Sequence, residues 1–310
     1  MKISIVIPCY NSQATIAKVV EMVMAEFDKM DNYTCEFVLV NDCSGDNTYA
    51  EIHKLGEKYP CVKGINLLRN FGQHNALMAA MHYTTGDYIL GMDDDMQTHP
   101  SQIYKLVQKM EEGYDLVYGT YPKKKNNSLK NISSKLNEVS SRILLGRPKD
   151  IVSSNFWMIT RQVRDEVVKY NSFNPYIDGI FYRTTHNIGN VEVEHFKREV
   201  GTSNYTLKKL MRLWLAYWNY SVIPLRISSV LGGISAAGGF IAALIVLIKK
   251  LLDPTTTVGW SSTIVIMVVF FGLVLMVLGI IGEYLGKMIL IMNNTPQFII
   301  REGINIEKED

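Results

Sequence analysis

Two long apolar runs near the carboxyl end limit what this chain can fold into more than any other feature. Residues 227–248 and 262–282 provide 22 and 21 consecutive residues without a charge. A helix of about 20 apolar residues spans the hydrocarbon core of a bilayer. We therefore predict a membrane hairpin over residues 223–292, with helices at about 227–248 and 262–282. The alternative, a buried helical pair in a soluble core, would need more surrounding protein than the chain has left.

The segment before the hairpin predicts an amphipathic helix over residues 203–222. Lys208, Lys209 and Arg212 lie away from its apolar face, which consists of Leu207, Leu210, Met211, Trp214, Leu215 and Trp218. A basic helix with tryptophan on its apolar face suits a membrane surface. A soluble helix that faces a protein core is the alternative.

The amino terminus gives an expectation about topology. Met1 and Lys2 lead directly into a strand-like segment, without a signal peptide. We therefore expect residues 1–202 to form a cytoplasmic domain, residues 293–310 a cytosolic tail, and the hairpin to cross the membrane. Lys249 and Lys250 would then lie on the far side, which conflicts with the positive-inside tendency. Four cysteines without metal-ligand spacing are consistent with a reducing compartment.

Residues 1–202 alternate short apolar strands with amphipathic helices, which is typical of an α/β fold with a mostly parallel sheet. Strands are expected at residues 3–7, 35–40, 62–66, 88–92 and 116–119, and a late one within 189–197. In such sheets ligands bind at the carboxyl ends of the strands. Asp42, Arg69 and the acidic triplet Asp93–Asp95 each follow a strand, so we expect them to meet in one crevice.

The acidic triplet predicts a site for a divalent cation. Side chains alternate in an extended segment, so Asp93 and Asp95 would point the same way and Asp94 would point outward. Mg²⁺ prefers oxygen ligands and often combines one or two carboxylates with substrate phosphates. A solvated acidic turn is the alternative.

Charge elsewhere gives weaker indications. The formal net charge is +2, so composition does not indicate binding to nucleic acid. Lys123–Lys125 form a basic loop, which fits either a clamp for an anionic substrate or an ordinary solvated loop.

Four segments resemble the successive motifs of family 2 glycosyltransferases in order and spacing: Ile5–Asn11, Asn41–Asp46, Arg69–His74 and Met92–Gln97. Over nearly its whole length the chain is similar to polyprenyl-phosphate glycosyltransferases of the dolichyl-phosphate mannose synthase, bactoprenol glucosyltransferase and undecaprenyl-phosphate aminoarabinose transferase types. The resemblance implies a GT-A fold, an inverting mechanism and Mg²⁺ or Mn²⁺. It also implies a nucleotide-sugar donor, with a UDP-sugar expected, and a polyprenyl phosphate acceptor. It further implies contact with membrane lipid, a bacterial inner membrane as the location, and a homo-oligomer.

The resemblance further implies roles for individual residues. The nucleotide-sugar would contact Pro8, Tyr10, Asn11, Asp42, Arg69, Gly72 and Asp93. The metal would be bound by Asp93, Asp95 and Gln97. Asp150 opens the segment that carries the proposed catalytic carboxylate, as a base or as a positioning group. The acceptor phosphate would be held by Arg198, Ser203, Lys124 and Lys130.

Some positions depart from the family pattern. Ser12 stands where relatives commonly have Glu, and Asn41 and Cys43 replace the first Asp and the Gly of Asp-Asp-Gly-Ser. Asn204 stands where many relatives carry a Lys, which removes one positive charge from the expected acceptor site. That charge would then come from Lys208, Lys209 or the Lys123–Lys125 loop.

Two other functions are compatible with the pattern. One is transfer to another lipid or to a lipid-linked glycan, and the other is a non-catalytic membrane scaffold that binds a nucleotide-sugar. The presence of Asp93, Asp95, Gln97 and Asp150 favours an enzyme. A phosphate monoester has a second pKa of about 6, so the expected acceptor is mostly a dianion at neutral pH and needs little help from a base.

Overall fold

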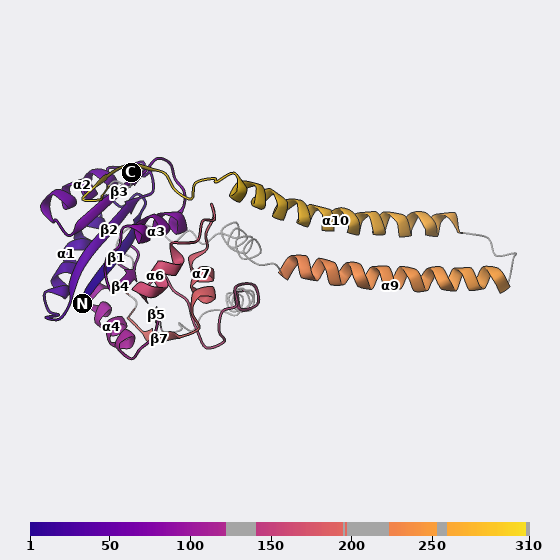
Figure 1. Ribbon diagram of the computed structural model, residues 1–310, viewed down its shortest axis with the longest axis horizontal. Helices are drawn as coiled ribbons and strands as arrows, with labels where there is room; N and C mark the ends of the chain where they lie inside the picture. The colour runs from indigo at the N-terminus through magenta and orange to yellow at the C-terminus, as the bar shows by residue number, and fades with distance from the viewer. Residues whose placement is uncertain (122–140, 195, 197–222, 253–258, 308–310) are drawn as a thin grey trace. The chain divides into compact units, whose positions relative to one another are not determined.

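The computed structural model describes residues 1–121, 141–194, 196, 223–252 and 259–307 (Figure 1). The predicted helix at 203–222 and the Lys123–Lys125 loop lie outside the described residues. The chain divides into two compact units, Met1–Leu210 with Thr295–Asp310 and Met211–Asn294.

The first unit is built on a mixed sheet, which among the described residues has the strand order β7-β5-β6-β4-β1-β2-β3-β8. The centre is parallel: β1 pairs with β2 and β4, and β2 pairs with β3. β5 and β7 are also parallel, while β6 runs antiparallel between β4 and β5. The strands are β1 (Lys2–Cys9), β2 (Thr34–Asn41), β3 (Val62–Leu67), β4 (Tyr88–Gly91), β5 (Leu116–Thr120), β6 (Trp157–Thr160), β7 (Ile188–Glu192) and β8 (Ile300–Ile304). The predicted α/β class with a mostly parallel sheet is confirmed.

Helices cover both faces of the sheet (Figure 1). Ile3, Ile5 and Ile7 on β1 belong to one buried cluster with the apolar sides of α1, α2 and α4, so these helices share one face. α3 contacts β1 and β2 from the other face through small buried residues such as Ala76 and Ala80. The helices of this unit are α1 (Ile16–Phe27), α2 (Thr48–Lys58), α3 (Gln73–His82), the 3-10 turn η1 (Pro100–Gln102), α4 (Ile103–Glu111), α6 (Arg161–Val167) and α7 (Ile177–Thr184).

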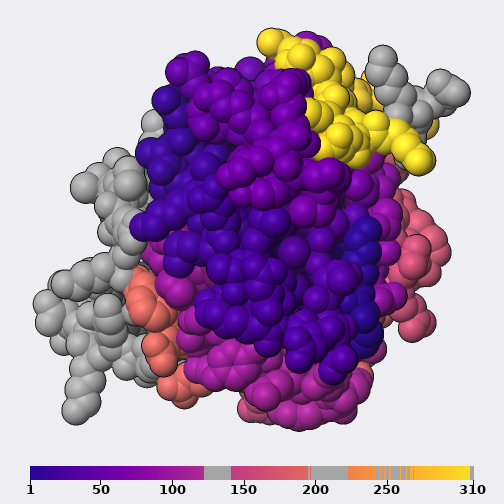
Figure 2. Space-filling model, turned by 90° about the vertical axis from the view of Figure 1, so that its left-hand side faces the viewer, coloured from indigo at the N-terminus to yellow at the C-terminus, as the bar shows by residue number. Residues whose placement is uncertain are grey.

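The carboxyl-terminal residues, expected to form a cytosolic tail over 293–310, take part in the sheet. Ile300–Ile304 forms β8, which pairs antiparallel with β3 and completes one edge of the sheet. Asn305 donates from Nδ2 to the carbonyl oxygens of Gly56 and Val62, both at 2.8 Å. Figure 2 shows these last residues, in yellow, lying against the purple residues that include α2 and β3. The end of the chain is therefore part of the first unit.

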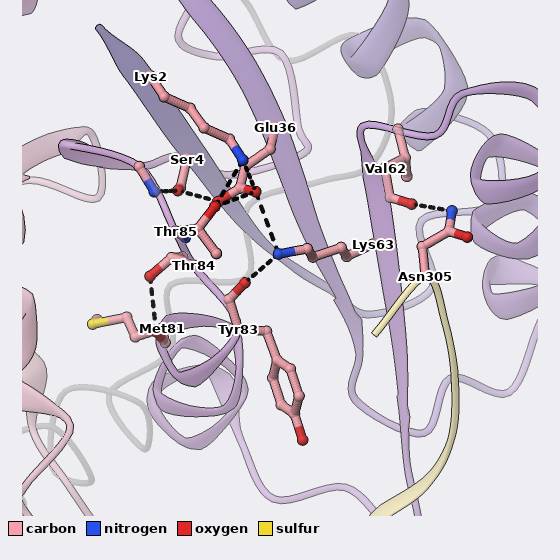
Figure 3. Close-up of polar contacts among 11 residues, drawn as sticks. Lys2, Ser4, Glu36, Val62, Lys63, Met81, Tyr83, Thr84, Thr85 and Asn305 are labelled. Atoms are coloured by element: carbon pink, nitrogen blue, oxygen red, sulfur yellow. Dashed lines mark hydrogen bonds and ion pairs between the residues drawn. The ribbon is translucent and has the colours of Figure 1, made fainter. Parts of the chain in front are cut away.

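A buried carboxylate joins several strands near their amino ends (Figure 3). Glu36 on β2 is only 3% exposed, and it forms ion pairs with Lys2 at 2.7 Å and Lys63 at 3.3 Å. It also accepts hydrogen bonds from Ser4 Oγ at 2.5 Å and from the Thr85 backbone N–H at 2.6 Å. These partners lie on β1, β3 and the segment before β4, at the opposite end of the strands from the predicted site.

The second unit contains two long helices, α9 (Ile223–Leu252) and α10 (Trp260–Met292). Both predicted helices are present, and each is longer than its uncharged run. Each helix contains one stretch that could cross a membrane by length and composition: Ile223–Ile241 in α9 and Val269–Met292 in α10. Large apolar side chains are exposed along both helices, for example Phe240 at 69% and Leu275 at 68%.

Candidate functional site

Two turns at the carboxyl ends of β1 and β2 hold each other in place. The Asn11 backbone N–H donates to Ser44 Oγ at 3.0 Å, and the Gly45 N–H donates to Asn11 Oδ1 at 3.1 Å. Asn11 and Cys43 both have positive φ, 56° and 54°. Glycine adopts this conformation without steric cost, which explains why the family pattern has Gly at the position of Cys43. Tyr10 is 57% exposed beside these turns and is accessible to a ligand.

Asp42 fixes the loop that follows β3. Its carboxylate accepts hydrogen bonds from the Phe71 N–H at 2.7 Å and the Gly72 N–H at 2.8 Å. Burial raises the pKa of Asp42, and the two hydrogen bonds oppose that shift. The Arg69 guanidinium lies 4.5 Å from the centre of the Phe71 ring. The structure thus brings Asp42, Arg69 and Gly72 together at one edge of the sheet, as the strand-end rule predicts.

The acidic turn after β4 is held by amide donors. Gln73 Nε2 donates to Asp93 Oδ1 at 2.9 Å, and Asn155 Nδ2 donates to Asp93 Oδ2 at 2.7 Å. Asp95 Oδ1 accepts from the Gln97 backbone N–H at 3.0 Å, which closes a tight turn. Asp93 is thereby fixed by the amino end of α3 and by the segment before β6.

Asp94 is partly buried, whereas alternation predicts that it points outward to solvent. Its Oδ2 atom is buried. Burial and then the charge of Asp94 raise the pKa of Cys9 well above its ordinary value, so the Asp94 carboxylate lies near the end of β1. Strand alternation does not extend to the triplet, because β4 ends at Gly91, before Asp93.

A cleft opens beside Asp93. It is lined by Pro8, Gln73, His74, Leu77, Met92, Asp93, Ser154, Asn155, Trp157, Ile177 and Asp178. Pro8 and Asp93 were predicted site residues. Gln73 and His74 lie inside a motif recognised in the sequence but were not assigned a role, and Asn155 lies in the Asp150 segment. No sequence signal distinguishes Asp178, which α7 brings to the cleft.

A glycine at the end of β4 makes room for the aromatic wall of this cleft. A Cβ on Gly91 would lie 2.2 Å from Cε2 of Trp157, well inside van der Waals contact. Trp157 is the β6 residue paired with Gly91, and its ring packs edge-on against Phe181 of α7 with centroids 4.9 Å apart. The glycine therefore lets the indole lie flat across the sheet and support the cleft.

Two ionisable groups of the cleft are held away from water. The Asp178 carboxylate accepts from the hydroxyls of Tyr118 at 2.7 Å and Tyr176 at 3.3 Å, and burial raises its pKa. Burial lowers the pKa of His74 to about 4, so the ring is neutral at pH 7. His74 Nδ1 is buried and has no hydrogen-bond partner among the described residues. A carboxylate can accept hydrogen bonds from sugar hydroxyls, and a neutral imidazole can both donate to them and accept from them.

The predicted acceptor-side residues do not gather in the described part of the cleft. Asp150 is exposed in the turn before β6 and is absent from the cleft lining. Its segment is attached to β7, because Val152 and Asn190 exchange two hydrogen bonds of 2.9 Å. Lys124, Lys130, Arg198 and Ser203 lie outside the described residues, and their roles stay predictions.

The acidic turn fits a metal that substrate phosphates complete. Among the described residues, no three His, Cys, Asp or Glu side chains are grouped to hold a metal ion by themselves. Burial raises the pKa of Tyr121, the hydrogen bond with Thr98 opposes that shift, and the charges of Asp93 and Asp95 add to it, so both carboxylates act on the same phenol. Two carboxylates and the Gln97 amide oxygen are hard ligands of the kind that Mg²⁺ and Mn²⁺ accept together with a diphosphate.

Comparisons with known proteins agree with this geometry. Residues 4–170 match the protein-family model described as Glycosyl transferase family 2. An uncharacterized glycosyltransferase of Bacillus subtilis (strain 168), YkcC, is 32% identical over 99% of this chain and 95% of its own length. The undecaprenyl-phosphate 4-deoxy-4-formamido-L-arabinose transferase of Shewanella sediminis (strain HAW-EB3) is 31% identical over 97% of this chain and 92% of its own.

Solved structures support the GT-A fold. Mannosyl-3-phosphoglycerate synthase from Rubrobacter xylanophilus aligns with a TM-score of 0.51 and 16% identity, over 74% of this chain and 75% of that one. Glucosyl-3-phosphoglycerate synthase from Mycobacterium tuberculosis, in complex with Mn²⁺, uridine diphosphate and glucosyl-3-phosphoglycerate, aligns with a TM-score of 0.50 and 19% identity. That alignment covers 71% of this chain and 78% of that one.

Proposed function

This chain belongs to glycosyltransferase family 2, and we propose that it transfers a sugar from a UDP-sugar to a polyprenyl phosphate, with inversion at the anomeric carbon. The observation that carries the proposal is the acidic turn, in which Asp93 lines a cleft and Asp95 lies two residues further on. Relatives that align with nearly the whole chain are named undecaprenyl-phosphate sugar transferases, which supports the acceptor class.

On the donor side, the two interlocked turns and the Asp42-held loop would bind the nucleotide. Tyr10 is exposed for contact with the base, while Asn11 and Asp42 are already fixed by their own hydrogen bonds. Asp93, Asp95 and Gln97 would hold Mg²⁺ or Mn²⁺, and the cation would neutralise charge that develops on the diphosphate leaving group. The M. tuberculosis neighbour in complex with Mn²⁺ and uridine diphosphate supports this arrangement for the fold.

On the acceptor side, the nucleophile is a phosphate oxygen. At neutral pH most of the phosphate is a dianion, so the protein needs mainly to orient it toward the anomeric carbon. Asp150 would act as a base or as a positioning group, and Arg198, Ser203, Lys124 and Lys130 would balance the phosphate charge. His74 and Asp178 line the donor cleft and would contact the transferred sugar.

The two long apolar helices supply the attachment to lipid. We place the first unit at the cytoplasmic face of the membrane, where nucleotide-sugars are made, and propose that α9 and α10 span the bilayer. The exposed apolar side chains along both helices are what a lipid environment would cover. A lipid-linked acceptor would then share the membrane to which the donor-binding unit is attached.

The direct test of this function is a transfer assay. Purified full-length chain in detergent is incubated with undecaprenyl phosphate, Mn²⁺ and a panel of UDP-sugars, and the lipids are analysed by mass spectrometry. We expect one donor to give a lipid with the added mass of a single sugar. A product on diacylglycerol or on a lipid-linked glycan would favour the other acceptor classes. No product with any donor or acceptor would favour a binding scaffold.

Asp150→Asn is expected to lower kcat by about a hundredfold, because loss of a group that orients the acceptor phosphate costs on this scale. KM for the UDP-sugar should change little, since Asp150 is absent from the donor cleft lining. Steady-state kinetics with the accepted donor provide both constants. An unchanged kcat would remove Asp150 from the catalytic group.

A further inference from the structure

A continuous chain of hydrogen bonds runs from the carboxyl-terminal strand to the turns at the predicted nucleotide site. Glu302 on β8 accepts from Asn66 Nδ2 on β3 at 2.8 Å. Asn66 Oδ1 accepts from Asn41 Nδ2 on β2, also at 2.8 Å. Asn41 Oδ1 then accepts from both the backbone N–H and the hydroxyl of Ser44. Ser44 Oγ in turn accepts the Asn11 N–H at 3.0 Å.

The direction of every bond in this chain follows from its two ends. A carboxylate can only accept, so Glu302 requires the NH₂ group of Asn66 to face it. The carbonyl of Asn66 then faces Asn41, which must offer its own NH₂ group and keep its carbonyl for Ser44. Asn41 and Asn66 are 4% and 8% exposed, so water competes weakly for these bonds.

β8 is held firmly enough to present Glu302. Its pairing with β3 is extended by Leu68, whose N–H donates to the Ile299 carbonyl at 2.9 Å, and by Arg301, whose Nη2 donates to the Leu68 carbonyl at 3.2 Å. A Cβ on Gly64 of β3 would lie 2.9 Å from a methyl carbon of Ile304, which shows how closely β8 packs.

We propose that Glu302 is a positioning residue for nucleotide binding, acting through Asn66 and Asn41 on the Asn11 and Ser44 turns; this rests on the proposed function. The family pattern has a carboxylate at the position of Asn41. In this chain an amide stands there, and the carboxylate that orients the turn comes from the end of the chain, two hydrogen bonds away.

The proposal predicts that the chain of bonds can be reversed as a whole. Asn41→Asp places an acceptor against the Asn66 carbonyl, and turning Asn66 over would then bring its carbonyl against Glu302. Glu302→Lys places a donor against the Asn66 NH₂ group. Turning Asn66 over would relieve that clash, but the Asn66 NH₂ group would then face the NH₂ group of Asn41. In the double variant, the introduced ammonium group would donate to the Asn66 carbonyl, and the Asn66 amide would donate to the introduced carboxylate. Ser44 would still donate to that carboxylate, so every polar atom regains a partner.

The test is a double-mutant cycle on the full chain in detergent, with the Kd for UDP measured by titration calorimetry in the presence of Mn²⁺. We expect each single variant to weaken UDP binding by about tenfold, the result of losing about 1.4 kcal/mol, and the double variant to return to within about threefold of wild type. Glu302→Gln keeps a carbonyl acceptor and should bind UDP nearly as wild type does. Glu307→Lys is a matched control for charge, since Glu307 is also exposed after β8, and it should neither weaken binding nor rescue Asn41→Asp.

Each outcome decides a different question. Glu302 is exposed, so its variants are expected to stay folded at the temperature of the titration, and a melting curve of each variant separates positioning from loss of fold. A double variant as weak as Asn41→Asp, or Glu302→Lys with wild-type UDP affinity, overturns the inference while leaving the proposed function standing. A wild-type chain that binds no UDP overturns the proposed function, and the positioning role with it.

Discussion

Replacing Asp95 with alanine is expected to lower sugar transfer by about a thousandfold, the scale on which loss of one group that stabilises developing charge acts. Asp95 follows the strand that delivers Asp93 to the cleft, and its Oδ1 atom accepts a hydrogen bond from the backbone of its own turn. Its second oxygen is the one we assign to the metal. Steady-state rates with the accepted donor, measured over a range of Mn²⁺ concentrations, check this prediction.

The binding of UDP with and without Mn²⁺ identifies the cause of that loss. Wild type should bind UDP more tightly with Mn²⁺ than without it. Asp95→Ala should lose this gain in UDP affinity but keep the affinity measured without metal. Asp94→Asn is the matched control, since Asp94 is the neighbouring carboxylate but lies toward Cys9. Asp94→Asn should keep both the gain in UDP affinity with Mn²⁺ and the wild-type turnover. Unimpaired transfer by Asp95→Ala would remove the metal assignment from this turn.

The sheet could be predicted where the signal is local. The apolar runs at Ile3–Ile7 and Val62–Asn66 lie within strands whose ends extend them by one or two residues. β8 gave no such signal, because Arg301, Glu302 and Gly303 interrupt its apolar pattern and stay exposed. It becomes a strand because β3 offers an unpaired edge, and that edge exists only after the sheet has formed.

The site residues also divide into those that local sequence predicts and those that it does not. Asp42, Arg69 and Asp93 were predicted to converge because carboxyl ends of parallel strands share an edge. The outward direction predicted for Asp94 does not hold for its Oδ2 atom, which is buried, because alternation holds only while the backbone stays extended. Asp178, Tyr118 and Tyr176 come from α7, β5 and the residue before α7, so their hydrogen bonds depend on how distant elements pack and leave no trace in local sequence.

The opposite end of the sheet should control stability without affecting the site. Glu36→Gln is expected to destabilise the first unit by about 3 kcal/mol, because it removes the charge that two lysines face in a buried position. The amide also turns an NH₂ group toward the donors that now surround the carboxylate. A loss of this size lowers the melting temperature by roughly 6–12 °C in a unit of this length, while kcat should stay at the wild-type value.

The pH dependence of this effect follows from the pKa of Glu36. Burial alone would raise that pKa, but hydrogen bonds from Lys2, Ser4 and Thr85 and the charge of Lys63 lower it from 4.5 to about 2. Because the folded pKa lies below the unfolded one, the carboxylate stabilises the fold fully above about pH 4.5, and this contribution is lost as pH falls toward 2. A shift of this size corresponds to about 3 kcal/mol. The melting difference between wild type and Glu36→Gln should therefore be constant near neutral pH and shrink in acid.

Glu21→Gln provides the matched comparison for Glu36. Glu21 also pairs with a lysine, Lys58 at 3.1 Å, but the side chains are 55% and 59% exposed. A surface pair of this kind contributes little to stability, and salt screens it. Thermal unfolding of both variants in the same detergent, from pH 7 down to pH 3, separates burial from charge. Equal melting temperatures for the two variants at pH 7 would show that the buried position of Glu36 adds nothing, and that the strands are held by their apolar core alone.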